Sequence, residues 1–311
     1  MTLHQTFFEW SRWLWPLIAN HIWQTTLIAT IAWIAVLLFK RAPARPRYLV
    51  WLIAFLKFLL PSALLLLAVK SCGIELAKPS TSTSVEIFFQ IAQPVSGFDQ
   101  DSVRLGDTAA APEGLVRRTG HSEIYCLLTI FWLLGAGVCL GRWWLLRRRF
   151  ARALKGGREV VGGPEALALQ RAREWLSLKR RVSLVESPEV CQPGVWRTWR
   201  PVIVLPEGLA GKLSTEELEA VMMHELIHVT RLDNLLGNAQ MLICCLFWFH
   251  PLVWLIDRRL LAERELVCDE YVIRYIGEPR VYAESLWKVA RFGLGWNLAG
   301  VSRAAGSNLK R

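Results

Sequence analysis

The sequence lacks the cysteine pattern of a disulfide-stabilised protein. Its seven cysteines are scattered, at least three of them lie inside apolar segments, and no Cys-x-x-Cys pair occurs. This spacing excludes a disulfide framework and a structural site built from Cys-x-x-Cys pairs. We therefore look for stability and chemistry in other residue types.

Acidic residues are also scarce, with 26 Asp and Glu against 37 Lys and Arg, a net charge of +11. Such an excess can indicate nucleic-acid binding, but here the basic residues gather at the ends of apolar runs, where membrane topology places them. The apolar fraction of 53% is high for a soluble protein, and 16 tryptophans suit interfacial belts. We expect a lipid bilayer as partner and no direct contact with nucleic acid.

Three apolar segments approach the ~20 residues needed to cross a hydrocarbon core. They are His21 to Phe39, Tyr48 to Val69, and Ile124 to Leu146. We expect residues 1–146 to form a membrane domain of three helices, with an extracytoplasmic loop at about 71–122.

Two features inside these spans bear on helix packing. Lys57 either snorkels to the interface or faces the interior of the bundle. Gly137 and Gly141 form a Gly-x-x-x-Gly pair that permits close helix approach. Packing within one chain explains this pair as well as a homodimer does.

The basic residues set the orientation, because Lys and Arg concentrate in cytoplasmic connections. They follow the first span as Lys40, Arg41, Arg45 and Arg47, and the third span as Arg147, Arg148, Arg149, Arg152 and Lys155. We expect a multi-pass protein of the cytoplasmic (inner) membrane, with its N-terminus outside and residues from 147 onward beginning inside.

The stretch His224-Glu225-Leu226-Ile227-His228 carries the chemistry. Ser214 and Glu217 form a capping box just upstream, and an apolar stripe follows at helical spacing, which predicts a helix. Two histidines four residues apart on a helix share one face and can bind one metal ion, and the intervening Glu225 can take a proton from water there. This pattern is typical of zinc peptidases.

A third protein ligand is expected downstream, since catalytic zinc commonly takes three protein ligands. Glu265 and Asp269 are four residues apart on a helical stretch, so one can bind metal while the other orients a histidine. Cys268 is either a further ligand or a small packing residue. A tyrosine such as Tyr271 or Tyr275 is a candidate for stabilising the negatively charged oxygen that forms during peptide hydrolysis.

The region after the third span predicts a small α+β domain. Pro164 to Leu176 has helical spacing, Arg181 to Glu186 and Pro201 to Leu205 look like strands, and Cys191 to Arg200 between the strands reads as a loop. Zinc peptidases often bind substrate along a sheet edge, and Val202 to Leu205 fits either that role or plain core packing.

Leu235 to Ile256 is as apolar as the spans. A full crossing would place Glu265 and His224 on opposite sides of the bilayer, so we expect Pro251 to break the helix. The segment then either enters and returns as a short hairpin or lies against the membrane face of the catalytic domain. His250 is either an extra ligand or a turn residue, and the turn is favoured. We expect the peptidase domain to cover residues 147–290 and a tail to cover 291–311.

The ordered motifs resemble the catalytic region of the BlaR/MecR-type regulatory membrane metallopeptidases. They are Pro-Val-Ile-Val-Leu-Pro (201–206), His-Glu-Leu-Ile-His (224–228), Asp233, Trp-Phe-His-Pro (248–251) and Glu-Leu-Val-Cys-Asp (265–269). The resemblance implies a mainly α-helical integral membrane protein with an embedded gluzincin-like zinc-peptidase domain. It makes His224, His228 and Glu265 the zinc ligands. It also makes Glu225 the general base, with Asp233 and Asp269 orienting the ligands.

The same resemblance implies cleavage of a cytoplasmic transcriptional repressor, often after self-cleavage. Antibiotic-sensing members continue into an extracellular penicillin-binding sensor, whereas this sequence stops at Arg311, so sensing of β-lactams is not expected. Ser285 and Lys288 match the Ser-x-x-Lys pattern of such sensors, but without its companion motifs, and we interpret the match as coincidence.

The residues leave three functions open. The first is a regulatory or quality-control zinc endopeptidase of the membrane. The second is a membrane zinc protease similar to the prenyl-protein and heat-shock types, which Cys268 and the short ligand spacing disfavour. The third is a non-catalytic membrane signalling scaffold that keeps a metal for structure.

Overall fold

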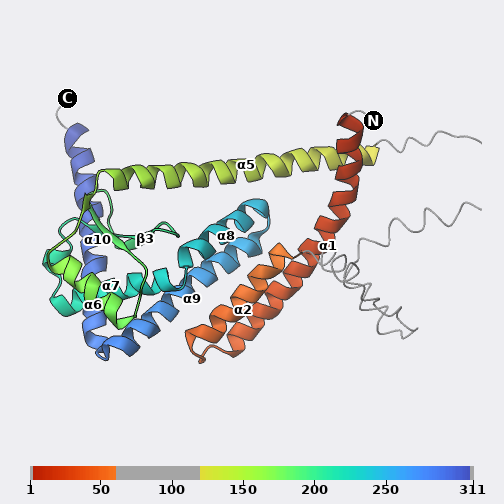
Figure 1. Ribbon diagram of the computed structural model, residues 1–311. Helices are drawn as coiled ribbons and strands as arrows, with labels where there is room; N and C mark the ends of the chain where they lie inside the picture. The colour runs from red at the N-terminus through yellow and green to blue at the C-terminus, as the bar shows by residue number, and fades with distance from the viewer. Residues whose placement is uncertain (1–2, 61–119, 309–311) are drawn as a thin grey trace, which may run out of the picture. The chain divides into compact units, whose positions relative to one another are not determined.

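The computed structural model describes residues 3–60 and 120–308, mostly as α-helix with one small mixed sheet (Figure 1). The chain divides into two compact units. The first comprises residues 1–140 and 243–260, and the second comprises residues 141–242 and 261–311. Most of the expected extracytoplasmic loop and the end of the second expected span lie outside the described residues.

The first unit contains α1 (Leu3–Leu38), α2 (Ala44–Leu56) and the short 3₁₀ turn η1 (Lys57–Leu59). It also holds the first part of α5 (Gly120–Lys155). Two stretches, Leu14–Leu38 and Glu123–Lys155, are long and apolar enough to cross a membrane. They agree with the first and third expected spans.

The outward surface of α5 fits contact with lipid. Leu127, Phe131, Leu134 and Val138 are each more than 60% exposed, and such a continuous apolar surface is unfavourable in water. Polar groups of this unit instead pair with one another: Lys57 Nζ lies 3.2 Å from Gln24 Oε1 on α1. The Lys57 amine also donates to the Leu60 carbonyl at 3.0 Å, so it contacts both a neighbouring helix and its own turn.

Among the described residues, neither Gly137 nor Gly141 has a neighbour that a Cβ would meet, so packing of this pair within the chain is not seen there, and the homodimer stays a prediction. The close approach occurs at Gly135, where a Cβ would overlap the indole ring of Trp248. The Trp248 Nε1 proton is donated to the carbonyl of Trp132, 3.2 Å away. A large side chain can pack here only because glycine leaves room for it.

Helices α8 (Asp233–Leu246) and α9 (Pro251–Ile276) form the expected turn-back rather than one continuous crossing. The chain reverses at residues 247–250, because Pro251 cannot continue a helix but suits the first position of one. As a result Asp233 at the start of α8 lies beside Cys268 on α9, with Oδ2 and Sγ 3.9 Å apart.

The division into units differs from the expected boundaries. Residues 243–260, which include the turn, belong to the first unit. The reason is local contact: His250 lies 3.2 Å from Thr26 of α1, and Trp132 of α5 donates to the carbonyl of Leu246 at 2.7 Å. Helix α10 (Pro279–Asn308) runs past residue 291, where a separate tail was expected.

The second unit is built on a four-stranded sheet of order β1-β2-β4-β3. The strands are β1 (Arg158–Glu159), β2 (Ser183–Ser187), β3 (Gly194–Trp196) and β4 (Val202–Pro206). Strands β2 and β4 are parallel, and the outer strands are antiparallel to them. β4 therefore lies inside the sheet and β3 forms one edge.

The core of this unit lies between the sheet and its helices. Leu184, Ile203 and Leu205 pack with α6 (Pro164–Trp175) and α7 (Thr215–Thr230). Helix α7 begins as predicted: the Ser214 hydroxyl accepts from the Glu217 backbone amide at 3.2 Å, and the Glu217 carboxylate accepts from the Ser214 amide at 2.7 Å. This fixed start sets which α7 side chains point away from the core.

Candidate metal centre

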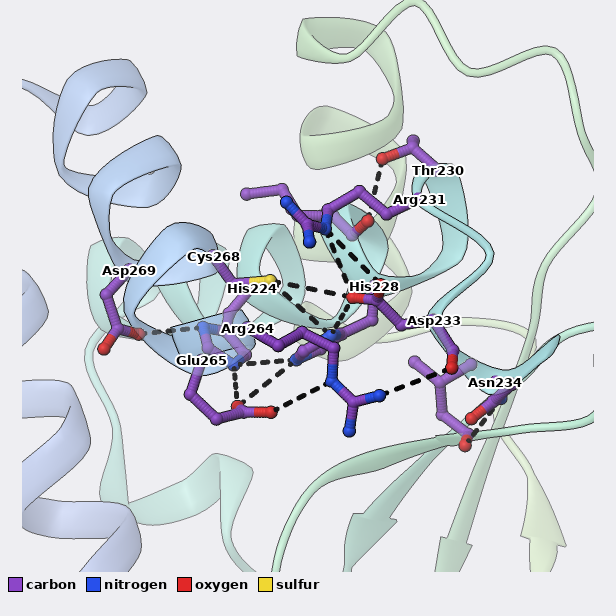
Figure 2. A network of polar contacts seen from close by, with 12 residues as sticks. His224, His228, Thr230, Arg231, Asp233, Asn234, Arg264, Glu265, Cys268 and Asp269 are labelled. Atoms are coloured by element: carbon purple, nitrogen blue, oxygen red, sulfur yellow. Dashed lines mark hydrogen bonds and ion pairs between the residues drawn. The ribbon is translucent and has the colours of Figure 1, made fainter. Parts of the chain in front are cut away.

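Helix α7 presents two imidazoles on one face. His224 and His228 are one turn apart, and their Nε2 atoms lie 3.1 Å from each other (Figure 2). Both side chains are about 15% exposed. Two ring nitrogens at this separation are arranged to receive a single proton or a single cation between them.

Glu265 of α9 completes the group. Its Oε2 atom lies 3.4 Å from His224 Nε2 and 3.5 Å from His228 Nε2. Tetrahedral zinc, with bonds of about 2.0–2.1 Å to nitrogen and oxygen, separates its ligand atoms by about 3.3–3.4 Å. The observed triangle of 3.1, 3.4 and 3.5 Å fits that spacing, and two imidazoles with one carboxylate are a donor set that zinc prefers.

The outer nitrogen of His228 is held by Asp233. Asp233 Oδ2 lies 2.8 Å from His228 Nδ1, and this carboxylate is 5% exposed. The link between α7 and α8 makes the contact possible: Leu232 adopts a left-handed backbone conformation with φ of 56°, which reverses the chain at once after α7. A non-glycine residue there costs about 1–2 kcal/mol, and the tertiary contacts of the turn offset it.

The outer nitrogen of His224 is held through a tyrosine that the sequence patterns did not single out. The Tyr282 hydroxyl, on α10, lies 2.8 Å from His224 Nδ1 and donates to Asp269 Oδ1 at 2.6 Å. Asp269 itself is 3.3 Å from His224 Nδ1. Because Tyr282 donates to the carboxylate, its oxygen accepts from the ring N–H, which leaves His224 Nε2 free as a ligand.

Cys268 lies on the far side of His228 from Glu265. Its Sγ is buried, 3.5 Å from His228 Nδ1. His228, Asp233 and Cys268 thus form a second set of possible metal donors. A metal there would remove the hydrogen bond between His228 and Asp233, whereas the Nε2 triangle keeps it.

The charges in the site affect one another strongly. Burial disfavours the protonated form of His224, but hydrogen bonds to Asp269 and Glu265 outweigh it and raise the pKa of His224 to about 9. For His228 burial has the same opposing effect, and hydrogen bonds to Asp233, Cys268 and Glu265 raise its pKa to about 12. Burial raises the pKa of Glu265, yet its bonds to both histidines dominate and lower it below its usual range. Protons and a metal ion therefore compete for the same two nitrogens.

Glu225 lies on the same helix, between the two histidines, and is 7% exposed. Burial raises its pKa, against the opposing effect of the nearby imidazoles. It shares a cavity of about 450 Å³ with His224, His228 and Glu265.

Two walls enclose this cavity. One is the sheet edge at Pro193, Gly194 and Val195, and the other is α10 at Leu286, Val289 and Ala290. Asn234 at the start of α8 anchors the edge strand by donating to the carbonyls of Val195 and Arg197, at 3.0 and 3.1 Å. Trp196 of the same strand stacks on Phe150 of α5, with ring centroids 4.8 Å apart.

Some expectations from the sequence need correction. Val202–Leu205 is not an edge strand: β4 is paired on both sides, and Ile203, Val204 and Leu205 are fully buried, so core packing is its role. The edge is β3, inside the segment 191–200 that was expected to be a loop. Its signal is weak because three residues are too few to show a period.

Other candidates lie away from the donor triangle. His250 belongs to the first unit and is in neither set of possible metal donors among the described residues. Tyr271 and Tyr275 do not line the cavity, whereas Tyr282 does. The Ser285 hydroxyl is fully buried and donates to the Tyr282 carbonyl, and Lys288 Nζ lies 2.6 Å from Glu217. Lys288 thus links α10 to α7, whereas Ser285 bonds within α10, and no contact between the two is found among the described residues.

Comparison with known proteins gives a consistent result. The chain is 30% identical over 144 residues to the regulatory protein BlaR1 of Bacillus licheniformis, and this match covers 46% of the chain and 24% of that relative. It is 24% identical over 169 residues to the methicillin resistance mecR1 protein of Staphylococcus aureus, with 54% of the chain and 29% of that relative covered. The chain thus spans about a quarter of the length of the curated relatives it matches.

A family model described as BlaR1 peptidase M56 matches residues 15–311, nearly the whole chain. This match includes the helices of the first unit as well as the donor triangle of the second. The resemblance drawn from the motifs is confirmed, and the chain belongs to the BlaR1 peptidase M56 family.

Proposed function

We propose that this protein is a membrane-embedded zinc endopeptidase that hydrolyses a protein on the cytoplasmic side. The observation that carries the proposal is the triangle of His224 Nε2, His228 Nε2 and Glu265 Oε2, with sides of 3.1 to 3.5 Å, beside the buried Glu225. A metal scaffold without catalysis does not require a buried carboxylate at the edge of a substrate-sized cavity.

The three triangle residues would hold the zinc ion. When bound there, zinc supplies a Lewis acid that polarises the scissile carbonyl and the attacking water. Asp233 and Tyr282 keep the Nδ1 protons of the two histidines in place, so that each Nε2 remains a ligand atom.

Glu225 would act as the general base. It takes the proton of the attacking water and passes it to the leaving amine, and its raised pKa suits this exchange because a base works best near the working pH. An extended peptide can lie along the β3 edge, where Gly194 and Val195 form the cavity wall. Asn234 already donates to one carbonyl of that strand, Val195, and to that of Arg197 just after it, so a bound peptide would share this edge with Asn234.

The regulatory role rests on the relatives, since one of them is named a regulatory protein. We infer that the substrate is a cytoplasmic regulator such as a transcriptional repressor, and that the chain is itself a second substrate. Orientation with the site in the cytoplasm follows from the basic residues that flank the helices.

The test is Glu225→Gln in the full chain, purified in detergent. We expect proteolysis of an unfolded protein such as casein to fall by at least about 10³-fold, because the general base is lost, while zinc content stays at one per chain. Glu219→Gln is the matched control, since Glu219 is on the same helix and forms a surface ion pair with Arg171. Full activity in the Glu225→Gln protein would remove the proposed mechanism.

A further inference from the structure

Arg264 is a charged group in the metal cavity that the mechanism above does not use. It precedes Glu265 on α9, its side chain is 15% exposed, and it lines the cavity. Figure 2 shows its guanidinium between Glu265 and the backbone of Asp233.

The contacts of this guanidinium are long. Its Nη1 donates to the Asp233 carbonyl at 3.5 Å, and its Nε lies 3.8 Å from Glu265 Oε1. The buried Nε makes no hydrogen bond. On the α8 side the guanidinium faces Gly237, where a Cβ would make an ordinary van der Waals contact with Nη1 at 3.6 Å.

A guanidinium carries five donors and keeps its charge at every physiological pH. Burying it without matched acceptors is costly, so a group placed this way gains when an oxygen acceptor arrives. We expect this acceptor to belong to a molecule bound in the cavity. The neighbouring carboxylate, Glu265, faces the two histidines with its other oxygen.

We propose that Arg264 is a substrate-positioning residue, which donates hydrogen bonds to an oxygen acceptor of the bound peptide. This inference rests on the proposed peptidase function and adds to it a recognition element. The acceptor is either a backbone carbonyl near the scissile bond or the carboxylate of an acidic side chain, and both supply the same chemistry.

The experiment compares Arg264→Gln and Arg264→Lys in the full chain in detergent. Casein is digested, the cut sites are mapped, and a peptide spanning the preferred site is used for kinetics. We expect Arg264→Gln to raise KM by about 10- to 100-fold, as expected for a lost charge-assisted hydrogen bond, with kcat close to the wild type. Arg264→Lys should fall between the two, because it keeps the charge but loses the planar fork.

Two measurements separate positioning from a structural role. Zinc content has to remain unchanged in both variants, and the dissociation constant of the labelled peptide has to rise by a similar factor in a Glu225→Gln background, where no cleavage occurs. Arg274→Gln is the control, because Arg274 is exposed on the same helix and does not line the cavity.

Peptides with acidic residues replaced by their amides identify the acceptor. If the replacement weakens wild-type binding but has no effect in Arg264→Gln, the acceptor is a carboxylate. If the amide replacement and Arg264→Gln each weaken binding by the same factor whether or not the other change is present, the acceptor is a backbone carbonyl. Unchanged KM and peptide affinity in Arg264→Gln, or zinc lost in step with affinity, would overturn the inference. A wild-type protein that cuts nothing contradicts the peptidase proposal instead.

Discussion

His21 and His250 of the first unit are buried, whereas His224 and His228 of the second are about 15% exposed, and the two pairs differ in what holds them. In the first unit His21 Nε2 contacts the Phe58 carbonyl at 3.1 Å and His250 Nε2 contacts the Thr26 hydroxyl at 3.2 Å. The Nδ1 atoms of both are buried without a hydrogen bond. In the second unit both nitrogens of His224 and His228 are engaged, and carboxylates take part in the contacts of each ring.

The difference separates a packing histidine from a candidate metal ligand. A neutral oxygen partner accepts a hydrogen bond from one ring nitrogen but brings no negative charge to the ring. It also brings no further ligand atoms close to the other nitrogen. A carboxylate near Nδ1 fixes the proton there and makes Nε2 a better ligand, and a third donor then has to face that nitrogen. Burial of a histidine alone therefore does not indicate a metal site. A hydrogen-bonded carboxylate at one ring nitrogen together with other ligand atoms facing the second nitrogen does indicate one.

The largest expected effect is on zinc content. His228→Gln removes one of three ligands while an amide can still bond Asp233, so we expect the purified protein to fall from about one zinc per chain to almost none. His250→Gln should keep its zinc. Metal analysis after gel filtration compares the two variants. Equal zinc content in both would contradict the assignment of His228 as a ligand and of His250 as a packing residue.

A smaller effect is expected at Tyr282. Tyr282→Phe keeps the ring packed in the core but removes the hydroxyl between His224 and Asp269, so zinc affinity should fall by about 10- to 100-fold. Competition with a chromophoric chelator measures this. Tyr275→Phe is the control on a tyrosine that is 41% exposed, and the same loss in both would argue against a positioning role.

The smallest effect is expected in the first unit. Thr26→Val removes the hydroxyl partner of His250 with little change in shape, and we expect the free energy of unfolding in detergent to fall by about 0.5–1.5 kcal/mol. Zinc content and peptidase activity should stay the same. A loss of zinc in this variant would show that the two histidine pairs are not independent.

Much of the candidate metal centre could be predicted from local patterns. The capping box at Ser214 and Glu217 and the four-residue spacing of His224 and His228 are properties of one helix, and both are present in the structure. The turn-back before Pro251 could also be predicted, since proline restricts the backbone wherever it stands. Short-range rules suffice for such features.

Other parts could not be found this way. Strand β3 is three residues long and pairs with β4, which comes later in the chain, so its identity as the sheet edge depends on the order of the strands. Tyr282 is 58 residues from the imidazole it holds, and nothing in its neighbourhood distinguishes it from Tyr271 or Tyr275. Arg264 could not be singled out either, because its long contacts with Asp233 and Glu265 depend on how α8 and α9 pack.

By itself, the sequence determined which side chains could bind a metal, the helix that carries the two histidines, and the family to which the chain belongs. These depend on residue identity and on spacing within one element. Only the tertiary structure decided which groups meet: that Glu265 faces both imidazoles, that Asp233 and Tyr282 hold the outer nitrogens, and that the cavity lies between β3 and α10. The reason is physical. Hydrogen bonding along a helix fixes neighbours one turn apart, whereas contacts between α7, α8, α9 and α10 depend on how their buried faces pack together.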